Sequence, residues 1–314
     1  MAGQALVIVD LIHCSASDGL RLDGALHVPR RSSGDSRAAP EEAQTAAREP
    51  APFDALLFLH GAAANFYGSR LSEEITPALL DLGMAVLWAN TRGHDAMTPF
   101  ASPGPRRRQG AAFEIVDECR LDVAAWVDWL VASGYVRVGI VGHSLGAIKA
   151  VYAQAHSPHD AVKAVIALSP PRLSYSAFQD GVRSDEFAAN IAAARAHVER
   201  GEPEALLDVR FPFPMLITAG GYLDKYGPAE RYNILRFADR VACPMLFCYG
   251  SIELASGGMP FAGLCEALDE LPRQGHVRDI AVVPGADHFY NDTWAELAVE
   301  VASWIRRRFA QRGS

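Results

Sequence analysis

From residue 54 onward, short continuous apolar runs alternate with longer segments whose apolar residues recur at helical spacing. The short runs are typical of strands buried on both faces, and the longer segments are typical of amphipathic helices, two of which stop at Gly83 and Gly134. The predicted strands are residues 54–60, 84–90, 136–142, 161–170, 244–250 and 279–285. The predicted helices are residues 69–83, 113–134, 145–156, 261–272 and 293–312. This alternation predicts an α/β fold with a mostly parallel central sheet and helices on both faces.

Three regions depart from the alternation. Residues 5–16 and 20–29 predict an N-terminal hairpin. Residues 30–52 are poor in large apolar side chains, which predicts a flexible surface insertion. Residues 171–241 hold a helical stretch at 184–201 and many aromatic residues, and they are too long for a simple connection. We interpret 171–241 as an inserted cap, with 1–170 and 242–314 forming the core.

Composition narrows the class of protein. A chain of 314 residues suits one large domain with insertions or two modest domains, and a net charge of −8 disfavours nucleic-acid binding. The arginine runs at 106–108 and 306–308 are interpreted as solvated surface. Five scattered cysteines suggest neither a disulfide framework nor a zinc site. No signal peptide or membrane span is apparent, so we expect a cytoplasmic protein with a small-molecule partner and no membrane association.

One pentapeptide carries candidate chemistry. Ser144 lies between Gly142 and Gly146, after a predicted strand and before a predicted helix, which is the context that a nucleophile elbow requires. The sharp turn holds the serine in a strained conformation, and side chains at the flanking positions would collide with neighbouring elements. The new helix offers free N–H groups to developing negative charge. The alternative is a glycine-rich turn in which a serine serves only for its size.

A serine nucleophile needs a base. His288, in the sequence "GADHF", follows the last predicted strand, whereas His13, His27, His60, His94 and His143 do not. The alternative for His288 is a solvated loop histidine.

The base needs an acid that lies between the serine and the histidine in chain order. Glu253 follows the predicted strand at 244–250 and is our candidate. Asp224 lies in the predicted cap. Asp287 adjoins the histidine in sequence, which leaves it poorly placed to orient the ring. The alternative for Glu253 is an ordinary surface glutamate.

The remaining candidate roles belong to backbone donors and to the cap. The N–H groups of Leu145 and Ala62 are expected to form the oxyanion hole, and His60 is expected to support that loop internally. Phe213 and Tyr222 are candidate substrate-binding residues of the cap, although aromatic residues there could equally form the core of the cap. We find no phosphate loop, dinucleotide fingerprint or metal-ligand cluster, so no cofactor and no metal are expected.

These elements together carry a family resemblance. "HG" at 60, "GHSLG" at 142, the acid at 253 and "GADHF" at 285 make the chain resemble the α/β-hydrolase superfamily over nearly its whole length. Within the superfamily the chain is similar to a poorly characterised group that includes fungal siderophore-esterase-like proteins. It departs from the usual pattern in having glutamate where most members have aspartate.

The resemblance implies a serine hydrolase that cleaves an ester or related acyl bond of a small, partly apolar molecule through an acyl-enzyme. Two alternatives remain open. The same three residues could serve a carbon–carbon bond hydrolase or lyase, or the fold could be a non-catalytic ligand-binding module. The sequence indicates neither the identity of the substrate nor the oligomeric state.

Overall fold

The computed structural model describes residues 9–29, 51–98, 108–273 and 276–309. The predicted insertion at 30–52 therefore falls outside the described residues except for its last two positions, as do Arg106 and Arg107 of the first arginine run. Within the described ranges, no helix is long and apolar enough to cross a membrane.

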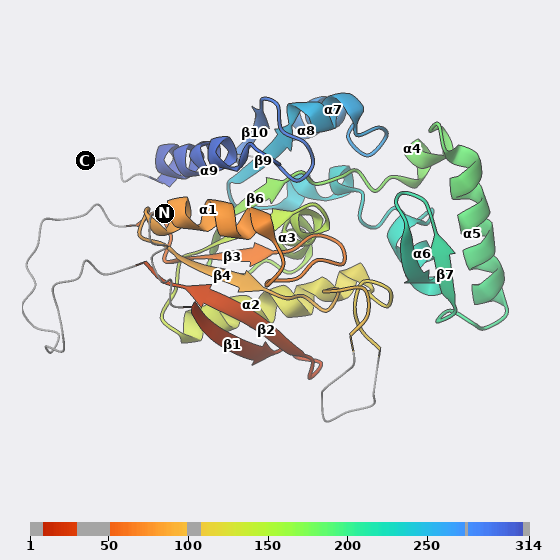
Figure 1. Ribbon diagram of the computed structural model, residues 1–314, viewed down its shortest axis with the longest axis horizontal. Coiled ribbons are helices and arrows are strands. Elements are labelled where there is room, and N and C mark those ends of the chain that lie inside the picture. Colours follow the sequence, from red (N-terminus) through yellow and green to blue (C-terminus); the bar gives the residue numbers. More distant parts are fainter. Residues whose placement is uncertain (1–8, 30–50, 99–107, 274–275, 310–314) are drawn as a thin grey trace, which may run out of the picture.

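An eight-stranded sheet forms the centre of the molecule, in the order β1-β2-β4-β3-β5-β6-β9-β10 (Figure 1). Its strands are β1 (Val9–Ser15), β2 (Arg21–His27), β3 (Ala55–Leu59), β4 (Ala85–Ala89), β5 (Val138–His143), β6 (Val162–Leu168), β9 (Met245–Gly250) and β10 (Arg278–Val283). The six strands from β4 to β10 pair in parallel, whereas β1 and β2 pair antiparallel at one edge. The predicted α/β fold class is confirmed.

Helices cover both faces of this sheet. Side chains alternate along a strand, so Leu56 and Phe58 of β3 pack toward one face and Leu57 and Leu59 toward the other. The first face is covered by α1 (Arg70–Leu80) and α9 (Trp294–Phe309). The second is covered by α2 (Cys119–Ala132), α3 (Leu145–His156) and α8 (Leu264–Glu270). Because neither face meets water, all five residues of β3 are buried, which explains the continuous apolar runs.

The chain between β6 and β9 folds into a set of smaller elements. They are α4 (Tyr175–Gln179), α5 (Ser184–Glu199), β7 (Leu206–Val209), β8 (Met215–Thr218), α6 (Ala219–Tyr226), η2 (Ile234–Arg236) and η3 (Ala238–Arg240). Figure 1 shows α4, α5, α6 and β7 on the side toward which β3, β4 and β6 point. The antiparallel pair of β7 and β8 was not expected from the sequence, because Pro212 and Pro214 stand between two short apolar runs.

Two further elements differ from the sequence prediction. The helix expected at 113–134 begins only at Cys119, after the 3₁₀ turn η1 (Val116–Glu118). Glu114, at the start of the expected helix, instead sends a buried side chain toward Lys149. The chain after β9 turns directly into α7 (Ser251–Ser256), so Glu253 lies in the first turn of a helix rather than in a loop.

Candidate active site

Ser144 occupies the sharp turn between β5 and α3. Its backbone has φ 55° and ψ −120°, a conformation that a residue with a side chain adopts only under constraint. A Cβ atom on Gly142 would lie 2.2 Å from the carbonyl oxygen of Gly146, and one on Gly146 would lie 2.3 Å from that of Leu59. Both flanking positions therefore require glycine, as the predicted elbow demands.

Three side chains meet at this turn. The Oγ of Ser144 lies 3.0 Å from Nε2 of His288, and Nδ1 of His288 is hydrogen-bonded to Oε1 of Glu253. A carboxylate can only accept, so Nδ1 carries the proton and Nε2 is free to accept from the serine hydroxyl. The other Glu253 oxygen accepts from the Oγ of Ser169 at 2.7 Å and from the N–H of Gly250 at 3.3 Å. The structure thus brings together the three residues that the sequence selected.

The two rival carboxylates are engaged elsewhere. Asp224 accepts a hydrogen bond from the hydroxyl of Tyr232 at 2.7 Å and pairs with Arg231. Asp287 accepts from the backbone N–H groups of Phe289 and Asn291, at 2.9 and 3.0 Å. Neither carboxylate bonds to the imidazole of His288.

Sequence reasoning missed two side chains that support the acid. Ser169 has φ 49°, immediately after β6, and it is fully buried against Glu253 and Tyr290. The hydroxyl of Tyr290 lies 2.9 Å from Oγ of Ser169 and 2.8 Å from the carbonyl oxygen of Cys248, so its one proton can go to either acceptor while Ser169 donates its own proton to Glu253. This buried chain of hydroxyls fixes the carboxylate. The available signals were weak: a serine at a strand end, and a tyrosine two residues after His288.

His143, inside the elbow, is hydrogen-bonded to the backbone of the candidate base, His288. Its Nε2 lies 2.7 Å from the carbonyl oxygen of His288. Burial, together with the nearby His288, lowers the pKa of His143 to about 3, so the ring is neutral and Nε2 donates to that carbonyl. The elbow therefore holds the backbone of the base as well as the serine. The sequence assigned this residue no role.

The two expected oxyanion donors, the N–H groups of Leu145 and Ala62, have no hydrogen-bond partner among the described residues. Leu145 is the first residue of α3. The loop after β3 passes close to the serine, because a Cβ on Gly61 would lie 3.3 Å from that of Ser144.

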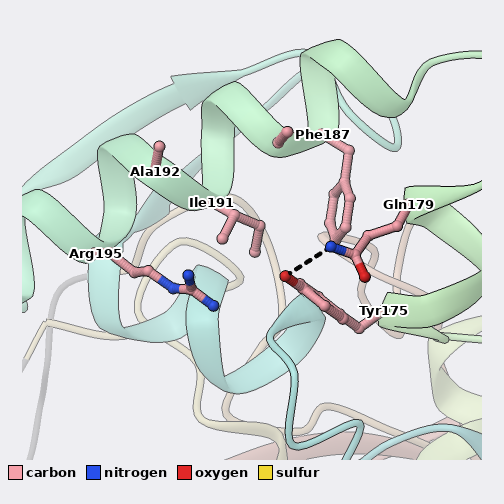
Figure 2. A pocket seen from close by; sticks show the side chains of 7 residues that line it. Tyr175, Gln179, Phe187, Ile191, Ala192 and Arg195 are labelled. Carbon is pink, nitrogen blue, oxygen red and sulfur yellow. Dashed lines mark hydrogen bonds between the residues drawn. The ribbon is translucent and has the colours of Figure 1, made fainter.

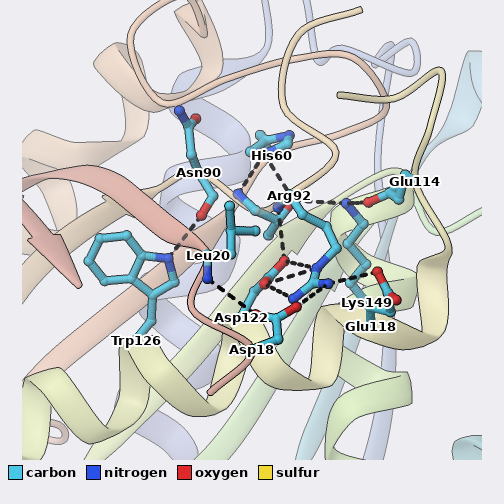
Figure 3. Close-up of polar contacts among 11 residues, drawn as sticks. Asp18, Leu20, His60, Asn90, Arg92, Glu114, Glu118, Asp122, Trp126 and Lys149 are labelled. Atoms are coloured by element: carbon cyan, nitrogen blue, oxygen red, sulfur yellow. Dashed lines mark hydrogen bonds and ion pairs between the residues drawn. The ribbon is translucent and has the colours of Figure 1, made fainter. Parts of the chain in front are cut away.

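His60 fixes this loop. Its Nε2 accepts from the N–H of Thr91 at 3.0 Å, so Nδ1 carries the proton and donates to the carbonyl of Gly61 at 2.8 Å (Figure 3 shows His60 and its surroundings). Burial and the charge of Lys149 lower the pKa of His60 to about 3, which keeps the ring neutral. The carbonyl that it holds belongs to the same peptide plane as the N–H of Ala62.

The two aromatic candidates differ sharply in exposure. Phe213 is 43% exposed and remains available to a ligand. Tyr222 has no exposed surface: its hydroxyl donates to the carbonyl of Phe211 at 3.3 Å, and its ring contacts that of Tyr226. The expectation that Tyr222 touches substrate is therefore corrected, because its contacts are those of a core residue within residues 171–241.

One pocket lies within the segment between β6 and β9, and another lies at the carboxyl end of β3. The first, of about 150 Å³, lies between α4 and α5 and is lined by Tyr175, Phe187 and Arg195 among others (Figure 2). The other, of about 390 Å³, is lined by residues that include Gly61 and His143. Neither pocket is lined by the reacting atoms of Ser144 or His288. In the part of the chain that the structure describes, no cluster of His, Cys, Asp and Glu is arranged to hold a metal.

Comparison with known proteins bears on the fold. Residues 54–196 match the family model for the alpha/beta hydrolase fold. No curated protein sequence matches the chain significantly.

Solved structures resemble the chain over almost its whole length. Est1E from Butyrivibrio proteoclasticus is 17% identical, with a TM-score of 0.61 over 96% of this chain and 99% of that one. The alpha/beta hydrolase GrgF from Penicillium is 15% identical, with a TM-score of 0.64 over 97% and 100%. The Pyrococcus furiosus esterase Pf2001 is 16% identical, with a TM-score of 0.53 over 98% of each chain. This match, the sheet order and the glycine-flanked elbow together show that the chain has the alpha/beta hydrolase fold.

Proposed function

We propose that this protein is a serine hydrolase that cleaves an ester or related acyl bond of a small, partly apolar molecule. The observation that carries the proposal is the unbroken hydrogen-bonded series from Ser144 through His288 to Glu253. A binding module has no need of a serine held in a strained conformation against an oriented base. The finer assignment to a siderophore-esterase-like group stays a prediction of the sequence.

The geometry supports a two-step mechanism. Nε2 of His288 takes the proton from Ser144 as Oγ attacks the carbonyl carbon of the substrate, and Glu253 stabilises the resulting imidazolium. The imidazolium then gives its proton to the leaving group, which departs and leaves an acyl-enzyme. His288 next deprotonates a water that hydrolyses the acyl-enzyme and regenerates the serine.

Negative charge on the substrate oxygen would be met by two backbone donors. The N–H groups of Ala62 and Leu145 have no competing acceptor within the described residues, and Leu145 also lies at the positive end of α3. Each preorganised donor of this kind contributes about 3 kcal/mol to transition-state stabilisation in serine hydrolases.

Residues 171–241 serve in this proposal as a cap inserted into a core made of 1–170 and 242–314. An insertion after a parallel strand emerges at the carboxyl edge of the sheet, where Ser144 also lies. A cap there would contact the variable part of a substrate and exclude water from the acyl site. Phe213 is the exposed aromatic residue that we assign to substrate contact.

The proposal is tested by replacing the nucleophile. Ser144→Ala removes one hydroxyl and should lower kcat on p-nitrophenyl esters by at least about a thousandfold, while the folded protein loses labelling by a fluorophosphonate. The matched control is Ser256→Ala, an exposed serine of α7 whose hydroxyl bonds only within its own helix. Near-wild-type turnover by Ser144→Ala would reject the mechanism.

The same measurements separate the alternatives. A carbon–carbon bond hydrolase would still react with the phosphonate but would turn over esters slowly across all acyl chain lengths. A binding module would neither be labelled nor turn over any ester. A panel of esters of graded chain length therefore distinguishes the three functions.

A further inference from the structure

An unusual pair of lysines lies behind the candidate oxyanion loop. The sequence contains three lysines, and two of them, Lys149 and Lys225, meet at the buried carboxylate of Glu114. The Nζ of Lys149 lies 2.5 Å from Oε1 of Glu114, and that of Lys225 lies 3.5 Å from Oε2. All three side chains are almost fully buried. Burying three charges is costly, and apolar residues of similar size are often at least as stabilising, so a purely structural role explains the group poorly.

A continuous series of hydrogen bonds leads from Lys149 to the oxyanion loop. Its Nζ donates to Oγ1 of Thr91 at 2.9 Å, and that hydroxyl lies 3.1 Å from Nε2 of His60, which it shares as an acceptor with the N–H of Thr91 at 3.0 Å. Figure 3 shows Lys149, Glu114 and His60 gathered around this point. An ammonium group can only donate and the carbonyl of Gly61 can only accept, so every hydrogen bond runs in the same direction.

The end of this series is a peptide group with a proposed catalytic role. The imidazole of His60 donates to the oxygen of Gly61, and the nitrogen of that peptide is the N–H of Ala62. A positive charge at the far end polarises each hydrogen bond in turn, and a polarised peptide is a stronger N–H donor. The same bonds fix the plane of the peptide, which preorganisation of an oxyanion donor requires.

We propose that Lys149 and Lys225, held together by Glu114, are positioning residues that orient and polarise the oxyanion donor at Ala62 through Thr91 and His60. This inference rests on the proposed serine hydrolase function. It assigns to the buried charges a task that packing alone does not explain.

The packing around Glu114 supports a specific arrangement. A Cβ on Gly93 would lie 2.1 Å from Oε1 of Glu114, so the loop that carries Thr91 packs directly on this carboxylate. Burial alone would raise the pKa of Glu114, but the charges of Lys149 and Lys225 lower it to about 2. The carboxylate therefore stays ionised and keeps both ammonium groups in place.

Lys225 brings residues 171–241 into this arrangement. It comes from α6, whereas Lys149 comes from α3 directly behind the elbow. The N–H of Thr218, the residue before α6, also donates to the carbonyl of Ala112 at 2.8 Å, two residues from Glu114. The segment between β6 and β9 is thus attached to the loop that the oxyanion donor depends on.

The test compares Lys149→Met, Lys225→Met and Thr91→Val with Lys163→Met, which changes the third lysine, an exposed residue of β6. Turnover of a p-nitrophenyl ester is measured per active site titrated with a fluorophosphonate, below the measured Tm of each variant. We expect kcat to fall about tenfold or more in Lys149→Met and Thr91→Val, with KM within about twofold, because the lost interaction acts in the transition state. The kcat of Lys225→Met should fall less than that of Lys149→Met, and the kcat of Lys163→Met should equal that of the wild type.

A second readout separates positioning from folding. A boronic acid inhibitor places a negative oxygen at the same donors, so its affinity should fall in parallel with kcat in Thr91→Val. A variant with a lowered Tm but unchanged kcat per active site and unchanged boronate affinity would overturn the inference. If Lys149→Met does not fold, Thr91→Val decides alone, since it keeps both lysines. A wild-type protein that neither turns over esters nor labels at Ser144 contradicts the proposed function itself, and the inference with it.

Discussion

Replacing Glu253 by glutamine is the most informative single change at the candidate site. Oε2 of Glu253 accepts from the N–H of Gly250 at 3.3 Å, so the amide oxygen of a glutamine would take that place. Its NH₂ group would then face Nδ1 of His288. That nitrogen would have to accept, which moves the imidazole proton to Nε2, where it blocks transfer from Ser144.

The cost of this change follows from the same contacts. If the glutamine amide were rotated by half a turn, its oxygen would accept from Nδ1 and the imidazole would keep its original tautomer. Its NH₂ group would then face the N–H of Gly250, and leaving these two buried donors without an acceptor costs about 1–3 kcal/mol. The neutral amide also forgoes a charge-assisted hydrogen bond to the imidazolium, which is worth about 1.5–3 kcal/mol. Together these terms come to about 4 kcal/mol, or about a thousandfold in kcat. Because the ground-state shape is kept, Tm should change little.

The assay is kcat on a p-nitrophenyl ester, together with the rate of inactivation by a fluorophosphonate, for Glu253→Gln and two matched controls. Asp287→Asn changes a carboxylate next to His288 in sequence, and Asp224→Asn changes the rival acid; neither bonds to the ring. Both controls should stay within about tenfold of the wild type. A folded Glu253→Gln enzyme with nearly full kcat, or a crippled Asp224→Asn enzyme, would refute this reading of the acid.

Three further outcomes are expected. Gly146→Ala should give little soluble, folded protein and a lower Tm, because its Cβ would lie 2.3 Å from the carbonyl oxygen of Leu59. Thermal unfolding measures this effect, and an unchanged Tm would contradict the close packing at this position. The pKa of Glu114 is about 2 against an ordinary 4.5, so its ionisation contributes about 3 kcal/mol to the free energy of unfolding above pH 4.5, and this contribution is lost as pH falls toward 2. In urea titrations at pH 4.5 and pH 2, Glu114→Gln should lack this loss of stability, and an undiminished loss in the variant would contradict the prediction. Tyr222→Phe should lower the free energy of unfolding by about 1 kcal/mol without changing the ranking of esters by kcat/KM. Phe213→Ala should change that ranking and leave Tm unchanged, because its side chain is exposed. The reverse pattern would contradict the assignment of Tyr222 to the core and of Phe213 to substrate contact.

The sequence by itself determined the features that arise from local geometry. Continuous apolar runs identify strands covered on both faces, since such strands need apolar side chains at every position. The elbow is equally local, because Gly142 and Gly146 are required by atoms a few residues away or on the adjacent strand. His288 could be selected because the end of the last strand is a defined place in the chain.

Only the tertiary structure decided which buried side chains meet. The sequence left open whether Tyr222 contacts substrate or lies in the core, and it indicated no role for Ser169, because hydrogen-bond partners far apart in the chain leave no pattern in the sequence. Ser169 and Glu253 are 84 positions apart, and Lys149 and Thr91 are 58. The elements that carry them converge only once the parallel strands align their carboxyl ends. For the same reason the sequence predicts Glu114 as part of a helix. In the fold it lies before that helix and forms ion pairs with Lys149 of α3 and Lys225 of α6.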